Sequence, residues 1–169
     1  VEKWHRAEGV HGSNGLGGLE LPPPRMAEQP ERAPAAIFRI ARENPGLTLL
    51  TLGPLTNVAM AVNLYPELKD LVGGIVAMGG AIERGNVTRF AEFNFFADPE
   101  SVQYVLDSGI HLDLVTWDAT LSVLHTRQDL AGMGFEASSS GKLLLDLLEV
   151  PFAYMARAYG SPGVRMPDP

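Results

Sequence analysis

The sequence predicts an α/β fold in which helices flank a mostly parallel sheet. Three short apolar segments, residues 47–52, 74–78 and 112–117, have the length and composition of buried strands. Segments with helical periodicity separate them along the chain, and strands that alternate with helices form parallel sheets. In such sheets the functional loops follow the carboxyl ends of the strands. The segments at these ends are 52–54, 78–80 and 117–119.

The first half of the chain combines a long loop with two helices. Residues 1–30 are rich in Gly and Pro and lack apolar periodicity, so we expect an extended loop. Residues 30–44 place apolar side chains at helical spacing and end in an Asn-Pro-Gly stop signal, which predicts a helix. A second helix is expected over residues 55–64, with Thr56 or Asn57 near its start.

The second half continues the alternation of strands and helices. Asp98 followed by Pro99 is typical of a helix start, with Asp98 as the cap and Pro99 in the first turn. Residues 138–160 have an apolar stripe that predicts a long helix, kinked at Pro151. We find neither an internal repeat nor a convincing linker, and therefore expect residues 1–169 to form a single, partial domain.

Composition narrows the classes of function. Hydrophobic residues at 46% and charged residues at 20% are ordinary for a soluble globular protein. The net charge of −7, from 13 Lys and Arg against 20 Asp and Glu, disfavours nucleic acids and anionic membranes as partners. The lack of cysteine excludes thiolate metal sites but leaves oxygen ligation of hard cations open. No apolar run reaches the ~18 to 20 residues of a membrane span, and no signal peptide is visible, so we expect a cytoplasmic protein.

Residues 78–100 are the most informative stretch, because polar side chains gather there beside an apolar strand. Asn86, Glu92 and Asn94 offer amides and a carboxylate, which together donate and accept hydrogen bonds as vicinal hydroxyls require. If residues 91–95 are extended, Glu92 and Asn94 point to one side and the phenylalanines to the other. The alternative is a polar surface loop, although a wholly solvated loop would not normally carry four phenylalanines.

A glycine-rich segment with one histidine occupies residues 11–18. No strand precedes it, its spacing is not GxGxxG, and no Gly-Lys-Ser/Thr follows, so the pattern does not predict a nucleotide-binding loop. From the residues alone, His11 is better interpreted as a loop residue than as a catalytic one.

Taken together, these segments resemble the nucleoside hydrolases, the inosine-uridine preferring nucleoside N-ribohydrolase family. The similarity covers the His-Gly segment at 11–18, the Gly-Pro-Leu-Thr-Asn turn at 53–57 and the series at 78–101, with a serine in place of the family's last alanine. Residues 115–121 match less closely. The resemblance implies an incomplete, Rossmann-like nucleoside hydrolase fold. It also implies hydrolysis of the N-glycosidic bond of ribonucleosides to ribose and free base, with Ca²⁺ as the cofactor of the full-length enzyme.

The resemblance further implies roles for individual residues. Asn86 and Glu92 would hold the 5′-hydroxyl end of the ribose, and Asn94 its diol. Leu52 would offer its backbone carbonyl to Ca²⁺, which Asp168 would also bind. Oxygen atoms around the ribose would stabilise an oxocarbenium-like transition state. The residues implied to contact the substrate are His11, Met78, Asn86, Glu92, Asn94 and Asp168.

Two departures from the family pattern set limits on these expectations. The aspartate cluster that supplies most calcium ligands and the general base has no counterpart here, so we interpret the chain as a fragment that is inactive alone, and leave its catalytic residue unassigned. Pro167 stands where many members have a histidine proposed to protonate the leaving base, which leaves the choice between purine and pyrimidine open.

The sequence leaves three functional hypotheses. The leading one is a nucleoside hydrolase that is a homo-oligomer when full length. The second is a non-catalytic ribose-binding or nucleoside-binding module, or a decayed hydrolase fragment. The third is a Rossmann-like domain whose polar loop is incidental.

Overall fold

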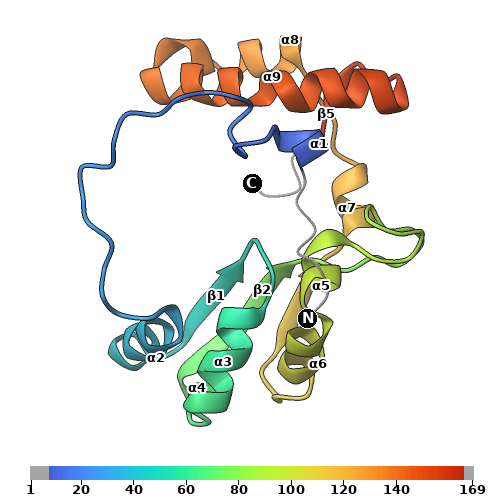
Figure 1. Ribbon diagram of the computed structural model, residues 1–169. Coiled ribbons are helices and arrows are strands. Elements are labelled where there is room, and N and C mark those ends of the chain that lie inside the picture. The colour runs from blue at the N-terminus through green and yellow to red at the C-terminus, as the bar shows by residue number, and fades with distance from the viewer. Residues whose placement is uncertain (1–7, 166–169) are drawn as a thin grey trace. The chain divides into compact units, whose positions relative to one another are not determined.

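The computed structural model describes residues 8–165, which divide into two compact units (Figure 1). One unit, residues 27–120, carries the parallel sheet, and the other combines residues 8–26 with 121–165. The expectation of a single partial domain over residues 1–169 stays a prediction.

In the sheet unit, strands and helices alternate along the chain as the sequence predicts. The three strands are parallel in the order β1-β2-β3, with β2 in the centre, which confirms the α/β fold. In the register of the sheet, Leu50 of β1 lies beside Val76 of β2, and Val76 lies beside Asp113 of β3. The elements are α2 (Ala33–Glu43), β1 (Leu47–Thr51), α3 (Thr56–Leu64), α4 (Leu68–Leu71), β2 (Val72–Met78), α5 (Phe93–Ala97), α6 (Pro99–Leu106), β3 (Leu112–Val115) and α7 (Trp117–Leu121), whose last residue belongs to the other unit.

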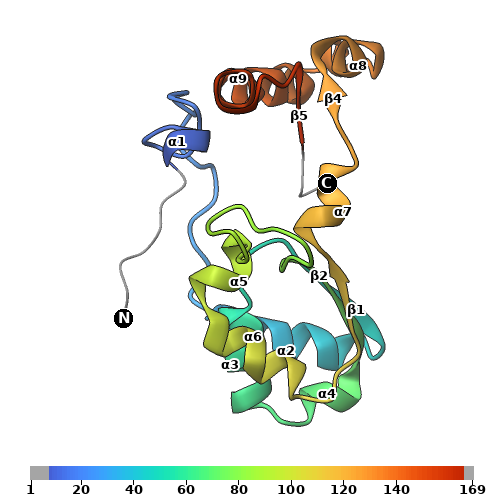
Figure 2. The ribbon, with the colours of Figure 1, turned by 90° about the vertical axis from the view of Figure 1, so that its right-hand side faces the viewer.

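The core of the sheet unit lies between the sheet and the helices α2, α3 and α6, which gather on one of its faces (Figure 2). Ile75 and Ala77 of β2 are fully or almost fully buried beneath these helices. Because β2 is the central strand, packing against it holds its carboxyl end in place. The buried side chains that α2, α3, α4, α6 and their flanking turns contribute include Ala41, Leu55, Val58, Ala61, Leu68, Val102 and Val105.

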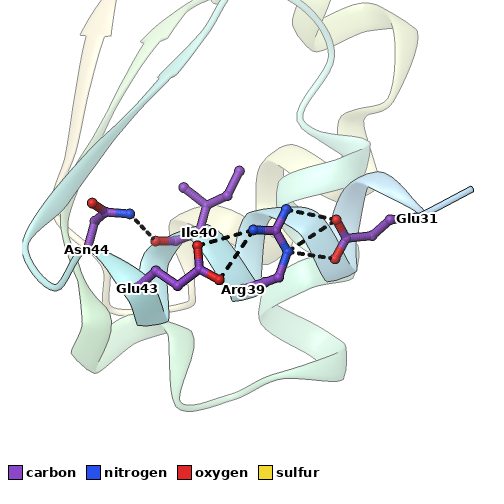
Figure 3. A network of polar contacts seen from close by, with 5 residues as sticks. All are labelled: Glu31, Arg39, Ile40, Glu43 and Asn44. Carbon is purple, nitrogen blue, oxygen red and sulfur yellow. Dashed lines mark hydrogen bonds and ion pairs between the residues drawn. The ribbon is translucent and has the colours of Figure 1, made fainter. Parts of the chain in front are cut away.

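A polar network stabilises α2 on its solvent side (Figure 3). The guanidinium of Arg39 donates hydrogen bonds to Glu31 at 2.9 Å and to Glu43 at 3.2 Å. The bond to Glu31, followed by the one to Glu43, raises the pKa of Arg39, and the bond from Arg39 lowers the pKa of Glu31. The side chain of Asn44 donates to the Ile40 carbonyl at 2.9 Å and so satisfies the last turn. All these groups are exposed, so the network contributes little to the stability of the fold.

The second unit is mainly helical. Ser138 caps α9, because its Oγ accepts the N–H of Gly141 at 3.0 Å, and Gly160 ends the helix in the left-handed region with φ 61°. The long helix expected over residues 138–160 is thereby confirmed. No helix within residues 8–165 is long and apolar enough to cross a membrane. The elements are α1 (Glu8–His11), β4 (His125–Thr126), α8 (Arg127–Gly132), a 3-10 turn (Phe135–Ala137), α9 (Ser139–Tyr159) and β5 (Gly163–Val164), which pairs antiparallel with β4.

Several boundaries differ from the sequence expectations, since β1 ends at Thr51 rather than at residue 52 and β2 begins at Val72 rather than at residue 74. The short helix α1 occupies part of the segment predicted as an extended loop. The third strand ends at Val115 rather than at residue 117, because the N–H of Trp117 donates to the Gly80 carbonyl at 2.9 Å and the chain turns there into α7. The segment after β3 is thus hydrogen-bonded to the turn that follows β2.

Candidate functional site

The site is built on the carboxyl end of β2, where Met78 is followed by two glycines. Gly80 has φ 72°, in the left-handed region that favours glycine. A Cβ atom on Gly79 would lie 2.5 Å from the ring of Phe95, so the ring occupies the space beside the turn. The glycine pair lets the start of α5 approach the end of the strand closely.

Glu92 precedes α5 and is only 2% exposed. Its Oε1 accepts the backbone N–H of Asn94 at 2.8 Å, and its Oε2 accepts those of Gly80 at 2.9 Å and Phe95 at 3.2 Å. A buried carboxylate is costly unless hydrogen bonds compensate it, and three backbone donors do so here. The same bonds cap α5 and tie it to the turn after β2.

Asn94 is buried, with 8% exposure, and lies against the last residue of β2. Its Nδ2 donates to the carbonyl oxygen of Met78 at 3.0 Å and lies 3.3 Å from the Sδ of the same residue. These contacts determine which way the side-chain amide faces. Met78, Glu92 and Asn94, all predicted to contact the substrate, are therefore brought together at one point of the fold.

The condition that residues 91–95 are extended is not met. Glu92 is the last extended residue, with φ −86° and ψ 151°, and the chain is helical from Phe93 onward. The Glu92 carboxylate accepts the N–H groups two and three positions ahead, as at a helix start. Glu92 and Asn94 nevertheless both contact the end of β2.

Asn86 lies in the loop of residues 81–91, between β2 and α5. Its Oδ1 accepts the backbone N–H of Phe93 at 2.8 Å, and its own N–H donates to the Ala91 carbonyl at 3.1 Å. The side chain of Asn86 is thus bonded to the first residue of α5, immediately after Glu92. With this contact, the third polar residue of the predicted cluster joins the other two.

Asp98 connects the helix α6 to the start of α3. Its Oδ1 accepts the N–H of Ser101 at 3.1 Å, which confirms the predicted cap. Its Oδ2 accepts a hydrogen bond from the hydroxyl of Thr56, the first residue of α3. The sequence groups Asp98 with the polar residues of 78–100 and predicts its capping role, but nothing local reveals a partner in another helix.

Asp118, at the start of α7, is a residue to which the sequence assigned no role, although residues 117–119 were placed at a strand end. Its Oδ2 accepts the N–H of Ile82 at 2.6 Å, and its Oδ1 accepts that of Glu83 at 3.1 Å. These backbone donors, with Ile82 the strongest, lower the pKa of the Asp118 carboxyl group. The carboxylate therefore joins the end of β3 to the loop that carries Asn86.

The described residues do not by themselves fit a calcium ion. Within residues 8–165 no group of three or more His, Asp or Glu side chains is placed to hold a metal. The Glu92 carboxylate already accepts three backbone N–H groups. Leu52 directly follows β1 and is partly exposed, whereas Asp168 and Pro167 lie outside the described residues. Ca²⁺ takes six to eight oxygen ligands, more than these residues supply.

His11 belongs to the other compact unit and is exposed. Its carbonyl oxygen accepts the N–H of Gly17 at 2.8 Å. The side chain of Asn14 organises the same turn, since its Oδ1 accepts the N–H groups of Leu16 at 3.0 Å and Gly18 at 2.9 Å. A role for His11 in the substrate pocket stays a prediction.

Comparison with known sequences finds relatives that are named as nucleoside-hydrolysing enzymes. It is 39% identical to a probable uridine nucleosidase 2 of Arabidopsis thaliana over 168 residues, which cover 96% of this chain and 51% of the relative. It is 35% identical to the pyrimidine-specific ribonucleoside hydrolase RihA of Salmonella newport over 165 residues, 96% of this chain and 53% of the relative. The chain thus spans about half the length of these relatives.

Solved structures agree with the sequence relatives. The plant nucleoside hydrolase PpNRh1 superposes with a TM-score of 0.85 at 33% identity, covering 96% of this chain and 52% of the plant enzyme's chain. A purine-preferring ribonucleoside hydrolase from Gardnerella vaginalis superposes with a TM-score of 0.87 at 29% identity, covering 95% and 52%. The family model of the inosine-uridine preferring nucleoside hydrolases matches residues 1–169. The chain belongs to this nucleoside hydrolase family.

Proposed function

We propose that this chain supplies the ribose-binding part of a nucleoside hydrolase. The full-length protein would hydrolyse the N-glycosidic bond of ribonucleosides to ribose and free base. The observation that carries the proposal is the meeting of Asn86, Glu92 and Asn94 at the carboxyl end of β2, in a chain that belongs to this family.

The free hydrogen-bonding atoms of the three side chains suit a ribose. Asn86 uses its Oδ1 on the N–H of Phe93, which leaves its Nδ2 as a donor. Asn94 uses Nδ2 on the Met78 carbonyl, which leaves its Oδ1 as an acceptor. Glu92 Oε1 accepts one backbone N–H and has a second acceptor position. Neighbouring hydroxyls both donate and accept, so this mixture matches them better than it would match a phosphate.

The buried charge of Glu92 also suits the chemistry. Cleavage of the bond between C1′ and the base nitrogen leaves positive charge on the ribose, and water then adds at C1′. A carboxylate held by three backbone donors is already oriented and needs no reorganisation when that charge develops. Glu92 is thus proposed to bind ribose and to stabilise the transition state, while the general base stays unassigned.

Other features of the full-length protein stay predictions. They include calcium dependence, with the Leu52 carbonyl and Asp168 as ligands, and a homo-oligomeric, cytoplasmic protein without nucleic-acid or membrane partners. The preference for a base also stays open, since one relative is named pyrimidine-specific and one solved structure purine-preferring. Pro167 cannot transfer a proton, so activation of the leaving base must come from another group.

Titration of the ¹⁵N-labelled protein with D-ribose and with uridine tests the binding site. The side-chain amide signals of Asn86 and Asn94 should shift together. The Asn63 amide is an internal control, because it lies on α3, where its Oδ1 accepts the Tyr104 hydroxyl at 3.0 Å. If the signals of Asn86 and Asn94 stay fixed at millimolar ribose, the proposed site is wrong.

An isosteric variant makes the test sharper. Asn86→Asp keeps the acceptor for the N–H of Phe93 but removes the Nδ2 donor, so we expect ribose affinity to fall about tenfold while the fold is kept. Asn63→Asp is the matched control and should bind ribose as the wild type does. Equal affinity in the two variants would contradict a direct role for Asn86.

Hydrolysis distinguishes the enzyme from a binding module. The full-length protein should release free base from uridine or inosine, and Asn86→Asp should slow that release. Ribose binding without any release of base would favour the non-catalytic module. A domain whose polar loop is incidental would show neither property.

A further inference from the structure

The loop of residues 81–91, which we call the ribose loop, is poorly held by packing. Ile82 is 81% exposed and Phe90 is 74% exposed, although both are large apolar residues. A loop that buries so little side-chain surface depends on hydrogen bonds for its position. The bonds that reach the ribose loop from other elements therefore decide where it places Asn86.

The second half of the ribose loop is closed by its own contacts. The carbonyl oxygen of Ala91 accepts the N–H groups of Asn86 and Val87, each at 3.1 Å. Thr88 Oγ1 accepts the N–H of Ala91 at 2.9 Å. The bond from the Phe93 N–H to Asn86 then joins this half to α5. These contacts shape the loop around Ala91 and tie one side of it to the helix.

The first half of the ribose loop is held from outside by the start of α7. Asp118 accepts the N–H of Ile82 at 2.6 Å and that of Glu83 at 3.1 Å. The neighbouring Trp117 donates its N–H to the Gly80 carbonyl at 2.9 Å. Three hydrogen bonds thus fasten residues 80–83 to the segment after β3, and two of them involve an ionised acceptor.

We propose that Asp118 is a positioning residue for ribose binding, whose carboxylate holds the first half of the ribose loop and so sets the place of Asn86. The ribose-binding part of this inference rests on the proposed function. Asp118 acts through the loop backbone and needs no contact with the substrate. Without it, the first half of the loop would keep only the bond from Trp117 to Gly80, while Glu92 and Asn94 would stay bonded to the end of β2.

Backbone amide hydrogen exchange in the Asp118→Ala variant tests whether the carboxylate holds the loop. We expect exchange at Ile82, Glu83 and Asn86 to accelerate about tenfold. The amide of Ile75 donates to the His111 carbonyl at 2.8 Å within the sheet and should exchange at the wild-type rate. Unchanged exchange at the three loop amides would overturn the proposal.

Asp113→Ala is the matched control, because Asp113 is an exposed carboxylate on β3 that lies 3.2 Å from His111. In the Asp113→Ala variant, the amides of the ribose loop should exchange at the wild-type rate. Equal acceleration in both variants would overturn a specific role for Asp118. If Asp118→Ala fails to fold, Asp118→Asn replaces it, because the amide keeps one acceptor oxygen. Faster exchange at Ile82 or Glu83 then supports the proposal, and wild-type exchange at both overturns it.

Ribose titration of the same variants separates this inference from the proposed function. A loosened loop together with several-fold weaker D-ribose binding supports the positioning role. A loosened loop with wild-type ribose affinity overturns that role. If the wild-type protein itself binds no ribose, the proposed function fails and the positioning role fails with it, whereas the exchange rates still decide whether Asp118 holds the loop.

Discussion

Replacing Glu92 by alanine should lower the free energy of unfolding by about 3–5 kcal/mol. The carboxylate is buried and accepts three backbone N–H groups, from Gly80, Asn94 and Phe95. Each buried donor left without a partner costs about 1–3 kcal/mol, so the three together cost about 3–9 kcal/mol, which already includes the loss of the α5 cap. We expect the lower part of the summed range, because water can enter the space that the side chain vacates. Since domains are stable by roughly 5–15 kcal/mol, this loss would leave the unit marginally folded.

Urea denaturation measures this change, with Glu100→Ala as the matched control. Glu100 is also a glutamate in the first turn of a helix, α6, but it is exposed and should lose less than about 0.5 kcal/mol. Equal midpoints for the two variants would refute the view that the Glu92 carboxylate joins α5 to β2. Glu92→Gln, which keeps one acceptor oxygen, should unfold closer to the wild type but bind ribose at least about tenfold more weakly.

Three further predictions concern packing, pH and metal. Gly79→Ala should lower the free energy of unfolding by about 1–3 kcal/mol and reduce the thermal midpoint, because its Cβ would meet the Phe95 ring. Gly53→Ala is the control and should keep the wild-type midpoint, because its Cβ meets nothing within 4 Å. Equal midpoints for the two variants would count against this packing. Asp129, in the capping box of α8, has a lowered pKa, first because its carboxylate accepts a backbone N–H. Its contribution to the stability of the fold is therefore present above the pKa of the unfolded chain, about 3.8, and is lost as the pH falls through the lower pKa of the folded chain. The difference in urea midpoint between the wild type and Asp129→Asn should thus vanish at the lowest pH, and a constant difference would contradict this. Millimolar calcium should leave the thermal midpoint of the 169-residue chain unchanged, and a raised midpoint would show that the chain binds calcium by itself. The chain alone should also release no base from uridine, and any release above the Glu92→Ala background would show that it is catalytically active by itself.

Much of the fold could be predicted because its signals are local. The helix over Ala33–Glu43 follows from apolar spacing and its stop signal, and the cap of α6 follows from Asp98 and Pro99. The central strand was recognised from a short apolar run. Such patterns act over a few residues, so they can be read without the rest of the molecule.

The errors arose where contacts between distant segments outweigh local patterns. The sequence left open whether residues 91–95 are extended, and the hydrogen bond from Gly80 to Glu92, which lies across 12 residues, helps to hold a helix start there. The third strand stops early because Trp117 donates to Gly80 instead of continuing the sheet. Neither contact leaves a trace in the sequence near the element that it changes.

The fold class, the resemblance to nucleoside hydrolases and the residue types of the candidate site can be read from the sequence, because these depend on periodicity and on characteristic short segments. How those residues are used is visible only in the folded chain. It assigns three acceptor positions of the Glu92 carboxylate to backbone N–H groups, and it brings Asp118 to Ile82 from 36 positions away in the sequence. A hydrogen bond needs its two atoms within about 3 Å, and only the folded chain brings together groups that are far apart in sequence.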